Sequence, residues 1–441
     1  MKLDPYPKYK NISISWIREI PSGWSTQKFR HLFEESSEKI QKEVIGQMLS
    51  VSGYRGVEFK TYDDENRRRN DEDLIGYRVV RKGQLVVNTM WLNYSGLGFS
   101  DLEGHVSPAY KAYFQRKDHY TPYLHYLLRS EIYKKGYTQL LTGIRPNSLQ
   151  MKREDLMNFP IILPPRLEQE SIAIFLDKEV SKINKLIIEK ERLIELLKEK
   201  RKVLISNAIT RGLNPNVTMK DSEVEYLGEI PSHWEIKKLK YIANLQTGLA
   251  KGKDYTSGEI ISVPFLRVAN VQDNYLNLEE IHMISILKSI HQRYQLRHGD
   301  VLMNEGGDFD KLGRGCVWRS EVKNCIHQNH VFAVRPHSVS PEWINLYTSS
   351  TLANAFFISR SKQTTNLASI SSKNLLSLPV PVPPKDECKK IIDWINVQLI
   401  RTESLEKTIN SSIDLLKEKS SSLISSAVTG KIDLRNRKEE S

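Results

Sequence analysis

The chain repeats parts of its sequence at an interval of about 215 residues. The motif IPSGW at 20–24 returns as IPSHW at 230–234, 210 residues later, and LLKEK at 196–200 returns at 415–419, 219 residues later. Solenoid and propeller units are about 20 to 50 residues long, so a repeat of this length corresponds to a domain with its connector. We therefore expect two similar halves.

The repeat is uneven along the chain. It is ungapped over 160–210, where a proline-rich stop precedes the motif LIS, at 204–206 in the first copy and 423–425 in the second. The stretch from Trp24 to Pro160 covers 136 positions, whereas that from Trp234 to Pro379 covers 145 and shares little identity with it. Similar frames with dissimilar contents indicate one task performed twice on different targets.

The repeated segments have the apolar spacing of long helices. Apolar residues recur at alternating steps of four and three from Leu176, as a coiled-coil seam requires, and most recur 219 residues later. One such helix needs a partner for its apolar stripe, and the nearest partner is its own copy. Either relative direction is topologically possible, and a pseudo-twofold axis across the helices makes them antiparallel. The residues expected in the seam are Leu176, Val180, Ile183, Ile187, Ile194, Leu197, Leu204, Ile395, Leu399, Ile409, Ile413, Leu416 and Leu423.

The globular parts have a mixed α/β pattern. Strands are expected at 84–88 and 109–114 in the first half, and at 262–271, 301–304 and 331–334 in the second. Helices are expected at 123–135 and 342–359. The similarity of KGQLVVN at 82–88 to HGDVLMN at 298–304 indicates that the two modules share a fold.

Composition favours a polyanionic partner and a cytoplasmic location. The formal net charge is +12, which makes nucleic acid the leading candidate. No stretch approaches the roughly 18 to 20 apolar residues of a membrane span. The three cysteines cannot form a disulfide framework and fit a reducing cytoplasm.

These features together resemble the specificity subunit of type I restriction-modification systems. The resemblance rests on the Pro-Ser-x-Trp openers, PFLRVANV at 264–271, GRGCVW at 313–318 followed by HQNH at 327–330, and Pro-Pro before a long helix that ends in Leu-Ile-Ser-x-Ala. It covers essentially the whole chain. It implies two α/β target recognition domains, at 1–160 and 213–379 with the linker, two long helices at 161–212 and 380–432, and a polar tail at 433–441.

The resemblance also implies a function and partners. Each domain would read one half of an asymmetric bipartite site in double-stranded DNA. The helices would set the spacer and dock two methyltransferase subunits, which would recruit the restriction subunits. This chain would be non-catalytic and bind no cofactor, while S-adenosylmethionine, ATP and Mg²⁺ would belong to the partner subunits.

Residues suited to contact bases or phosphates lie in both modules, since Arg and Lys suit guanine and Asn and Gln suit adenine. In the first module the candidates are Tyr54, Arg55, Arg67, Arg68, Arg69, Asn88, Asn93, Tyr94, Tyr110, Arg145 and Asn147. In the second they are Arg267, Asn270, Asn304, Lys311, Arg314, Gln328, Asn329, His330, Lys362, Gln363, Thr364 and Asn366. The loops 142–147 and 360–366 are expected to read a groove. Asn88 and Asn304 could equally stabilise the turns after their strands, and Arg67 to Arg69 could form a solvated charged loop.

The sequence pattern gives weaker support to other roles for these and neighbouring residues. Trp24 and Trp234 are expected in the core rather than stacked on bases. Cys316, Cys325, His327 and His330 match no usual zinc-ligand spacing, so packing or DNA contact is favoured over a metal site. An enzyme subunit with its own active site is disfavoured, since neither Pro-Pro pair lies in a methyltransferase signature and no phosphate loop is complete. A structural coiled-coil protein with protein- or RNA-binding modules stays the alternative.

Overall fold

The structure, a computed structural model, describes residues 4–53, 56–61, 71–143, 149–250, 257–307, 312–363 and 368–435. The chain divides into two compact units. Unit 1 consists of Met1–Glu191 and Asn410–Ser441, and unit 2 of Arg192–Ile409, so each unit receives one end of each long helix. In the described part of the chain, no helix has the length and apolar character needed to cross a bilayer.

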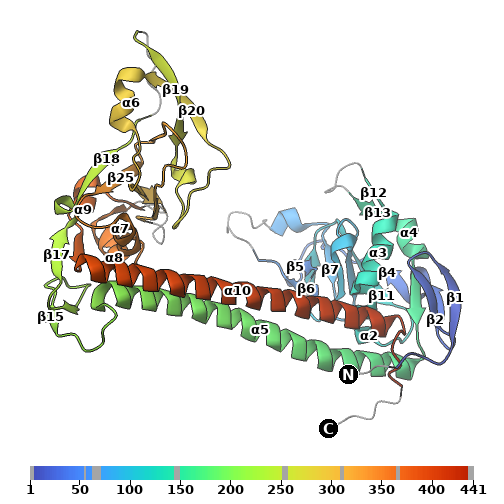
Figure 1. Ribbon diagram of the computed structural model, residues 1–441. Coiled ribbons are helices and arrows are strands. Elements are labelled where there is room, and N and C mark those ends of the chain that lie inside the picture. The colour runs from blue at the N-terminus through green and yellow to red at the C-terminus, as the bar shows by residue number, and fades with distance from the viewer. Residues whose placement is uncertain are drawn as a thin grey trace. The chain divides into compact units, whose positions relative to one another are not determined.

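Unit 1 holds, within its described residues, two four-stranded sheets ordered β6-β5-β10-β7 and β4-β11-β8-β9, together with three two-stranded sheets (Figure 1). Its strands are β1 (Tyr9–Ile14), β2 (Ile17–Pro21), β3 (Ser25–Lys28), β4 (Phe33–Glu35), β5 (Gln47–Ser52), β6 (Gly56–Phe59), β7 (Arg78–Val80), β8 (Leu85–Asn88), β9 (Leu97–Phe99), β10 (Gly104–Val106), β11 (Tyr110–Gln115), β12 (Leu141–Thr142), β13 (Gln150–Met151) and β14 (Pro160–Leu163). Its shorter helices are α1 (Phe29–Leu32), α2 (Thr121–Arg129), α3 (Glu131–Leu140) and α4 (Arg153–Asn158), with the 3-10 turns η2 (Asp71–Leu74) and η3 (Leu92–Tyr94).

Unit 2 holds, where it is described, a four-stranded sheet ordered β18-β25-β21-β23, two three-stranded sheets and two strand pairs. Its strands are β15 (Met219–Asp221), β16 (Glu229–Pro231), β17 (Glu235–Lys238), β18 (Ala243–Thr247), β19 (Ile260–Leu266), β20 (His282–Leu287), β21 (Val301–Asn304), β22 (Gly306–Gly307), β23 (Gly315–Val317), β24 (Ile326–His327), β25 (Val331–Pro336), β26 (Lys362–Gln363), β27 (Ala368–Ser369) and β28 (Pro379–Val382). Its shorter helices are α6 (Lys288–Tyr294), α7 (Pro341–Thr348), α8 (Thr351–Arg360) and α9 (Ser372–Leu376), with the 3-10 turns η5 (Leu239–Tyr241) and η6 (Val268–Asn270).

The two units share a fold, as the sequence predicts. The order β4-β11-β8-β9 in unit 1 corresponds to β18-β25-β21-β23 in unit 2, with antiparallel neighbours throughout. Each unit also pairs its opening strand with the strand of its proline stop, β3 with β14 and β17 with β28. The repeated opener and the repeated stop are therefore hydrogen-bonded partners.

The long helices are α5 (Arg166–Arg211) and α10 (Lys385–Val428), of 46 and 44 residues. In the core of unit 1, Leu176 near the start of α5 packs with Ala427 at the end of α10. In the core of unit 2, Ile209 at the end of α5 packs with Ile391 near the start of α10. The helices therefore run antiparallel, as expected, and Figure 1 shows them side by side. All thirteen expected seam residues are buried or half-buried.

Three expected elements end earlier or break. The expected helices at 123–135 and 342–359 are each two helices, because Ser130 and Ser350 adopt an extended backbone and their hydroxyls accept hydrogen bonds from the backbone N–H groups of Tyr133 and Ala353. The expected strand at 262–271 ends at Leu266, after which the chain forms η6. The serine breaks occur at equivalent places in both units.

The opening tryptophans lie in the two cores, as expected. Trp24 is 1% exposed and Trp234 is fully buried. The indole N–H of Trp24 donates to Glu168, at 2.9 Å, whereas the ring of Trp234 packs edge-on against Trp343. Stacking of either ring on a base is excluded by this burial.

Candidate nucleic-acid interface

In both units a β-hairpin is tied to the end of a central sheet strand. The backbone N–H of Met151, in β13, donates to the carbonyl of Thr89, the residue after β8, at 3.1 Å. In unit 2 the N–H of Ile370, after β27, donates to the carbonyl of Glu305, the residue after β21, at 2.9 Å. We call these two edges, each made of a strand end and its hairpin, the reading edges. The loops expected to read a groove connect the strands of these hairpins, β12 to β13 and β26 to β27.

Three candidate base readers form hydrogen bonds with nearby backbone groups. Asn88 accepts a hydrogen bond from the N–H of Met90 through its Oδ1 atom, at 3.1 Å. Asn304 is 2% exposed, and its Nδ2 donates to the carbonyl of Val271 at 3.0 Å. Asn270 is 4% exposed and accepts from the N–H of Arg267 at 2.8 Å. The structure thus gives these amides a positioning role, and their contact with bases stays a prediction.

Other candidates are exposed or half-buried. Tyr94 in η3 is 59% exposed. Tyr110 is half-buried and lies opposite Asn88 in the register of β11 and β8. His330 is exposed, and its Nδ1 lies 2.6 Å from a carboxylate oxygen of Glu305. The half-buried candidates are Asn93, Arg267, Arg314, Gln328 and Asn329, and Lys362 is exposed.

Several candidates lie outside the described residues. These are Tyr54, Arg55, Arg67, Arg68, Arg69, Arg145, Asn147, Lys311, Thr364 and Asn366, and the side chain of Gln363 is likewise not described. Their contact with DNA stays a prediction.

The sequence analysis missed two apolar residues at the reading edge of unit 1. Trp91 is 57% exposed and Met90 is 37% exposed, and both directly follow Thr89. Their signal was an aromatic residue inside a polar turn, at TMWLNY after the strand that ends in Asn88. The search for polar base readers passed over it.

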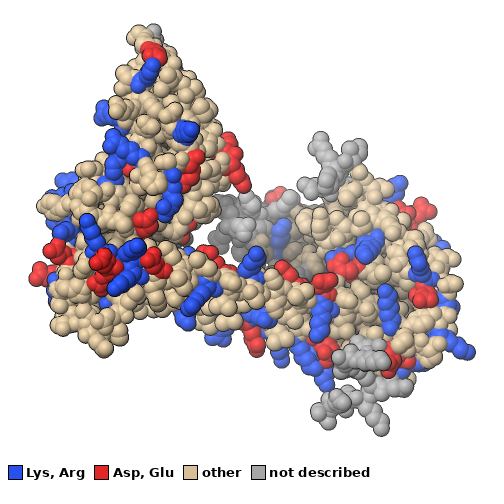
Figure 2. Space-filling model, in the orientation of Figure 1, with Lys and Arg blue, Asp and Glu red and all other residues tan. Residues whose placement is uncertain are grey.

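The basic charge is dispersed over the face that Figure 2 displays. Lys and Arg side chains alternate there with Asp and Glu, both over the globular parts and along the long helices (Figure 2). The net charge of +12 is therefore not gathered into one patch on this face. Such a surface suits general attraction to a polyanion, with selectivity left to particular side chains.

The four residues weighed as a zinc site serve other roles. Cys316 and Cys325 are buried in an apolar cluster with Trp318, and burial raises the pKa of each thiol to about 12. The Nδ1 of His327 lies 2.7 Å from the carbonyl of Val331. Among the described residues, no group of His, Cys, Asp and Glu has the arrangement of a metal site.

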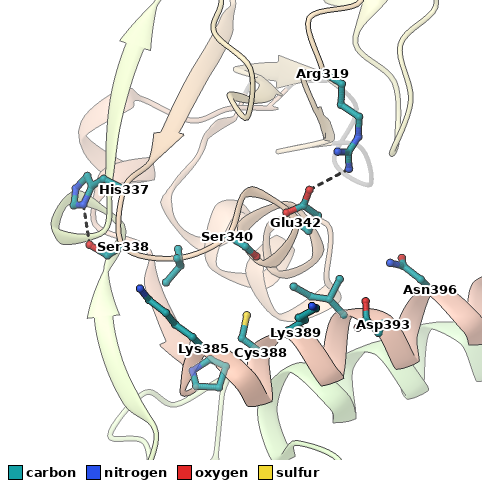
Figure 3. Close-up of a pocket in the computed structure, with 13 residues that line it drawn as sticks. Arg319, His337, Ser338, Ser340, Glu342, Lys385, Cys388, Lys389, Asp393 and Asn396 are labelled. Atoms are coloured by element: carbon teal, nitrogen blue, oxygen red, sulfur yellow. Dashed lines mark hydrogen bonds and ion pairs between the residues drawn. The ribbon is translucent and has the colours of Figure 1, made fainter.

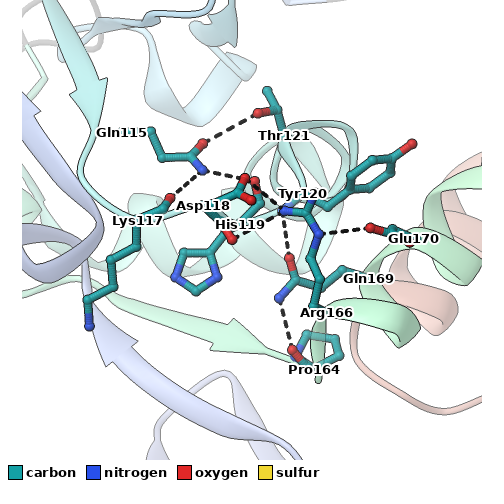
Figure 4. A network of polar contacts seen from close by, with 10 residues as sticks. All are labelled: Gln115, Lys117, Asp118, His119, Tyr120, Thr121, Pro164, Arg166, Gln169 and Glu170. Atoms are coloured by element: carbon teal, nitrogen blue, oxygen red, sulfur yellow. Dashed lines mark hydrogen bonds and ion pairs between the residues drawn. The ribbon is translucent and has the colours of Figure 1, made fainter.

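A cavity of about 620 Å³ opens where α10 begins in unit 2 (Figure 3). Its wall includes Cys388, which stands 219 positions after Gln169 in the repeat. In unit 1 the side chain of Gln169 fills the equivalent place, accepting from the N–H of Tyr120 and donating to the carbonyl of Pro164, both at 2.9 Å (Figure 4). The shorter cysteine leaves this junction open. Burial raises the pKa of the Cys388 thiol to about 11, so it is neutral and weakly nucleophilic at physiological pH.

Comparison with known proteins identifies relatives of this architecture. Residues 231–415 match the family described as the type I restriction modification DNA specificity domain. The EcoKI specificity subunit of Escherichia coli K12 is 24% identical over 326 residues, which are 73% of this chain and 67% of that protein. The MjaVIII specificity subunit of Methanocaldococcus jannaschii is 26% identical over 324 residues, 71% of each chain.

Solved structures share the fold at low sequence identity. A chain from a structural study of complex assembly and conformational transition of the type I R-M system superimposes with a TM-score of 0.65 at 15% identity, over 94% of this chain and 99% of that one. The HsdS subunit of Thermoanaerobacter tengcongensis gives a TM-score of 0.50 at 15% identity, over 94% and 98%. Residues 231–415 thus match a type I specificity domain, and the chain as a whole is similar to type I restriction-modification specificity subunits in its duplicated units and antiparallel helices.

Proposed function

We propose that this chain is the non-catalytic subunit that gives a type I restriction-modification complex its DNA sequence specificity. Each unit reads one part of a bipartite site in double-stranded DNA. The observation that carries the proposal is the pair of reading edges, because their backbone ties are the same while the side chains on them differ. An equal framework with unequal contents suits two unlike half-sites.

The side chains at equivalent positions support two different readings. Thr89 in unit 1 corresponds to Glu305 in unit 2 by the shared hairpin tie. A threonine hydroxyl donates and accepts hydrogen bonds, whereas a carboxylate only accepts, and Glu305 is also engaged by His330. Thr89 is 6% exposed and its hydroxyl accepts from Nε2 of Gln150, whereas Glu305 is half-buried, so the two edges differ in the side chains that a DNA groove can reach.

The helices support the docking of two like partners. Among the described helical residues, Leu186 and Leu196 of α5 are 46% and 51% exposed. Their counterparts 219 positions later, Leu405 and Leu415 of α10, are 52% and 66% exposed. Since α5 and α10 run antiparallel, unit 1 carries Leu186 with Leu415, and unit 2 carries Leu405 with Leu196. We propose that each pair contributes to docking one methyltransferase subunit.

The partner subunits supply the chemistry in this proposal. S-adenosylmethionine is placed with the methyltransferase subunits, and ATP and Mg²⁺ with the restriction subunits. This chain positions those subunits on DNA and binds none of the three.

A selection from random duplex DNA tests the proposal. The full-length chain, alone and with its methyltransferase partner, is incubated with a pool of 40-base-pair duplexes that carry a randomised centre. We expect enrichment of one asymmetric site with two defined parts and an undefined spacer. A random RNA pool run in parallel tests the alternative of an RNA-binding coiled-coil protein. Failure of both preparations to enrich duplex DNA contradicts the proposed function.

Exposed-leucine variants test the docking separately. Leu186→Lys and Leu405→Lys each place a charge on one proposed docking site, so each single variant is expected to retain one methyltransferase subunit and the double variant none. Val203→Lys is the matched control. Val203 is 57% exposed on α5, but its counterpart in α10, Ser422, is polar, so this position is not part of a repeated apolar surface. The mass of the complex, measured by native mass spectrometry, counts the bound subunits. Full occupancy of the double variant contradicts this docking surface.

A further inference from the structure

An exposed aromatic pair stands on the reading edge of unit 1. Trp91 is 57% and Tyr94 is 59% exposed, and their ring centroids are 5.4 Å apart with 52° between the ring planes. Met90 beside them is 37% exposed. Two large aromatic side chains that are each more than half exposed leave much apolar area in water, which is unfavourable unless a partner covers it.

The backbone of this turn is held by several hydrogen bonds. The N–H of Trp91 donates to the carbonyl of Asn88 at 3.0 Å, and the N–H of Tyr94 donates to the carbonyl of Trp91 at 2.9 Å. Ser95 follows in the left-handed conformation, with φ of 54°, and the N–H of Gly96 returns to the carbonyl of Trp91 at 2.8 Å. These backbone hydrogen bonds hold the turn in a conformation that leaves both rings exposed.

The aromatic pair is joined to the hairpin of the same edge. Thr89, two residues before Trp91, accepts from the N–H of Met151 through its carbonyl and from Nε2 of Gln150 through its hydroxyl, at 3.1 and 3.2 Å. The hairpin β12–β13 and the aromatic pair thus project from one framework.

Polar and cationic groups lie in the same turn and on α3, which contacts η3. A cleft of about 440 Å³ is lined by Asn93, from the same turn, and by Lys134 and Lys135 of α3. The Oδ1 atom of Asn93 has no hydrogen-bond partner among the described residues. Lys134 forms an ion pair with Glu131 one turn earlier in α3. An apolar ring surface on a turn that carries an amide, with two ammonium groups on the contacting helix, suits a nucleobase and its phosphate.

At the described positions that correspond to Met90 and Trp91, unit 2 has two glycines. There, Glu305 is followed by Gly306 and Gly307, which form β22 and pair with β27. Trp91 thus has no aromatic counterpart at the described position 307 of unit 2.

We propose that Trp91 and Tyr94 form a stacking surface for an unstacked nucleobase of the DNA half-site bound by unit 1, with Lys134 and Lys135 next to the adjoining phosphate. This inference rests on the proposed function and deepens it. Every base has a π-face, so stacking on the rings adds affinity, while the cost of unstacking a base step depends on sequence and adds selectivity.

Ring-removing variants of the full-length chain test the inference. The probe is the 40-base-pair duplex obtained from the random pool, with 2-aminopurine placed in turn at each adenine of both half-sites. Trp91→Ala is expected to weaken binding by about 5- to 150-fold, the range that loss of one base–aromatic stack produces. Trp91→Phe is expected to restore part of this loss. With wild-type protein, 2-aminopurine fluorescence is expected to change at one position of one half-site, and this change is lost in Trp91→Ala.

Tyr241→Ala is the matched control. Tyr241 is an aromatic residue of unit 2 with 63% exposure, so its removal deletes a similar area away from the proposed surface. We expect its affinity for the probe to stay within twofold of wild type. Selection with Trp91→Ala is expected to relax the half-site of unit 1 and to leave the other half-site unchanged.

The outcomes separate this inference from the proposed function. If wild type binds its bipartite site and Trp91→Ala binds it within twofold with the same half-sites, the stacking surface is refuted and the function stands. If wild type enriches no duplex, both are refuted. If Trp91→Ala instead loses the methyltransferase subunit while its DNA affinity is unchanged, the rings cover a protein partner and the inference is refuted.

Discussion

Gly430 and Gly212 end the two long helices in the same left-handed conformation but in different surroundings. Their φ angles are +73° and +72°. A Cβ atom on Gly430 would lie 2.5 Å from Cδ of Pro21 and 3.1 Å from Cη2 of Trp24. A Cβ atom on Gly212 would meet Oε1 of Glu387 at 3.1 Å, the end of a flexible side chain. The pair therefore separates the cost of backbone strain from the cost of a clash.

Replacement of each glycine by alanine is expected to destabilise its own unit to a different degree. The left-handed conformation costs an L-residue about 1–2 kcal/mol, so Gly212→Ala should lower the stability of unit 2 by about that amount. Gly430→Ala carries the same cost and also forces apart the stiff ring of Pro21 and the buried indole of Trp24, which adds about 1–3 kcal/mol. The expected loss in unit 1 is thus about 2–5 kcal/mol.

Hydrogen exchange of the full-length chain, read by mass spectrometry on separate peptides, measures these losses unit by unit. Gly83→Ala is the control for the backbone term in unit 1, because Gly83 has φ of +81° and nothing within 4 Å of the added Cβ. It should match Gly212→Ala in cost. Equal losses for Gly430→Ala and Gly83→Ala would refute the argument that the opener of unit 1 closes tightly on the end of α10.

Three further expectations follow from other contacts. Changing Leu197 and Leu416 together to Asp places two charges in the half-buried helix seam. The double variant should no longer assemble with methyltransferase subunits, while both of its units keep slow hydrogen exchange. Retained assembly would count against the scaffold role of the helices. Burial lowers the pKa of His327 to about 4 from an ordinary value near 6.5, so protonation of this side chain favours the unfolded state. The stability of unit 2 should therefore fall by up to about 3 kcal/mol as the pH falls from 6.5 to 4. A His327→Gln variant whose stability depends on pH as steeply as that of wild type would contradict this. Gln169→Cys should lower the stability of unit 1 by about 1–3 kcal/mol, since two buried backbone groups lose their hydrogen-bond partner. Cys388→Gln places its side chain in an open cavity and should change the stability of unit 2 little. Equal losses in the two units, measured by hydrogen exchange, would contradict the account of the junction.

The seam was predictable from sequence because helix packing depends on a regular spacing of apolar residues. Leu176 and Ile395 stand at repeated positions of the ladder and are both fully buried. The breaks at Ser130 and Ser350 were not predicted, because a serine inside an apolar pattern caps a helix only where its backbone is extended. That choice depends on tertiary packing, which the local sequence does not specify.

The reading edges were predictable in place but not in detail. Strands that end at Asn88 and Asn304 were correctly expected. Their hydrogen bonds to the local backbone were an open alternative, because an amide that suits adenine also suits a turn. Trp91 was missed because hydrogen-bonding capacity was the criterion, and an indole exposed on a polar turn has the same sequence pattern as one that folds back into the core.

The uneven repeat follows from the way the helices close the units. The end of α10, which belongs to the second copy, packs at Gly430 against Pro21 and Trp24 of the first copy's opener. The end of α5, from the first copy, lies at Gly212 near Trp234 of the second opener. A change in either helix end must therefore suit an opener in the other copy, which constrains both sequences together. The reading edges have no such cross-copy partner in their described contacts, so their side chains are free to differ, and two unlike half-sites can be read from one duplicated frame.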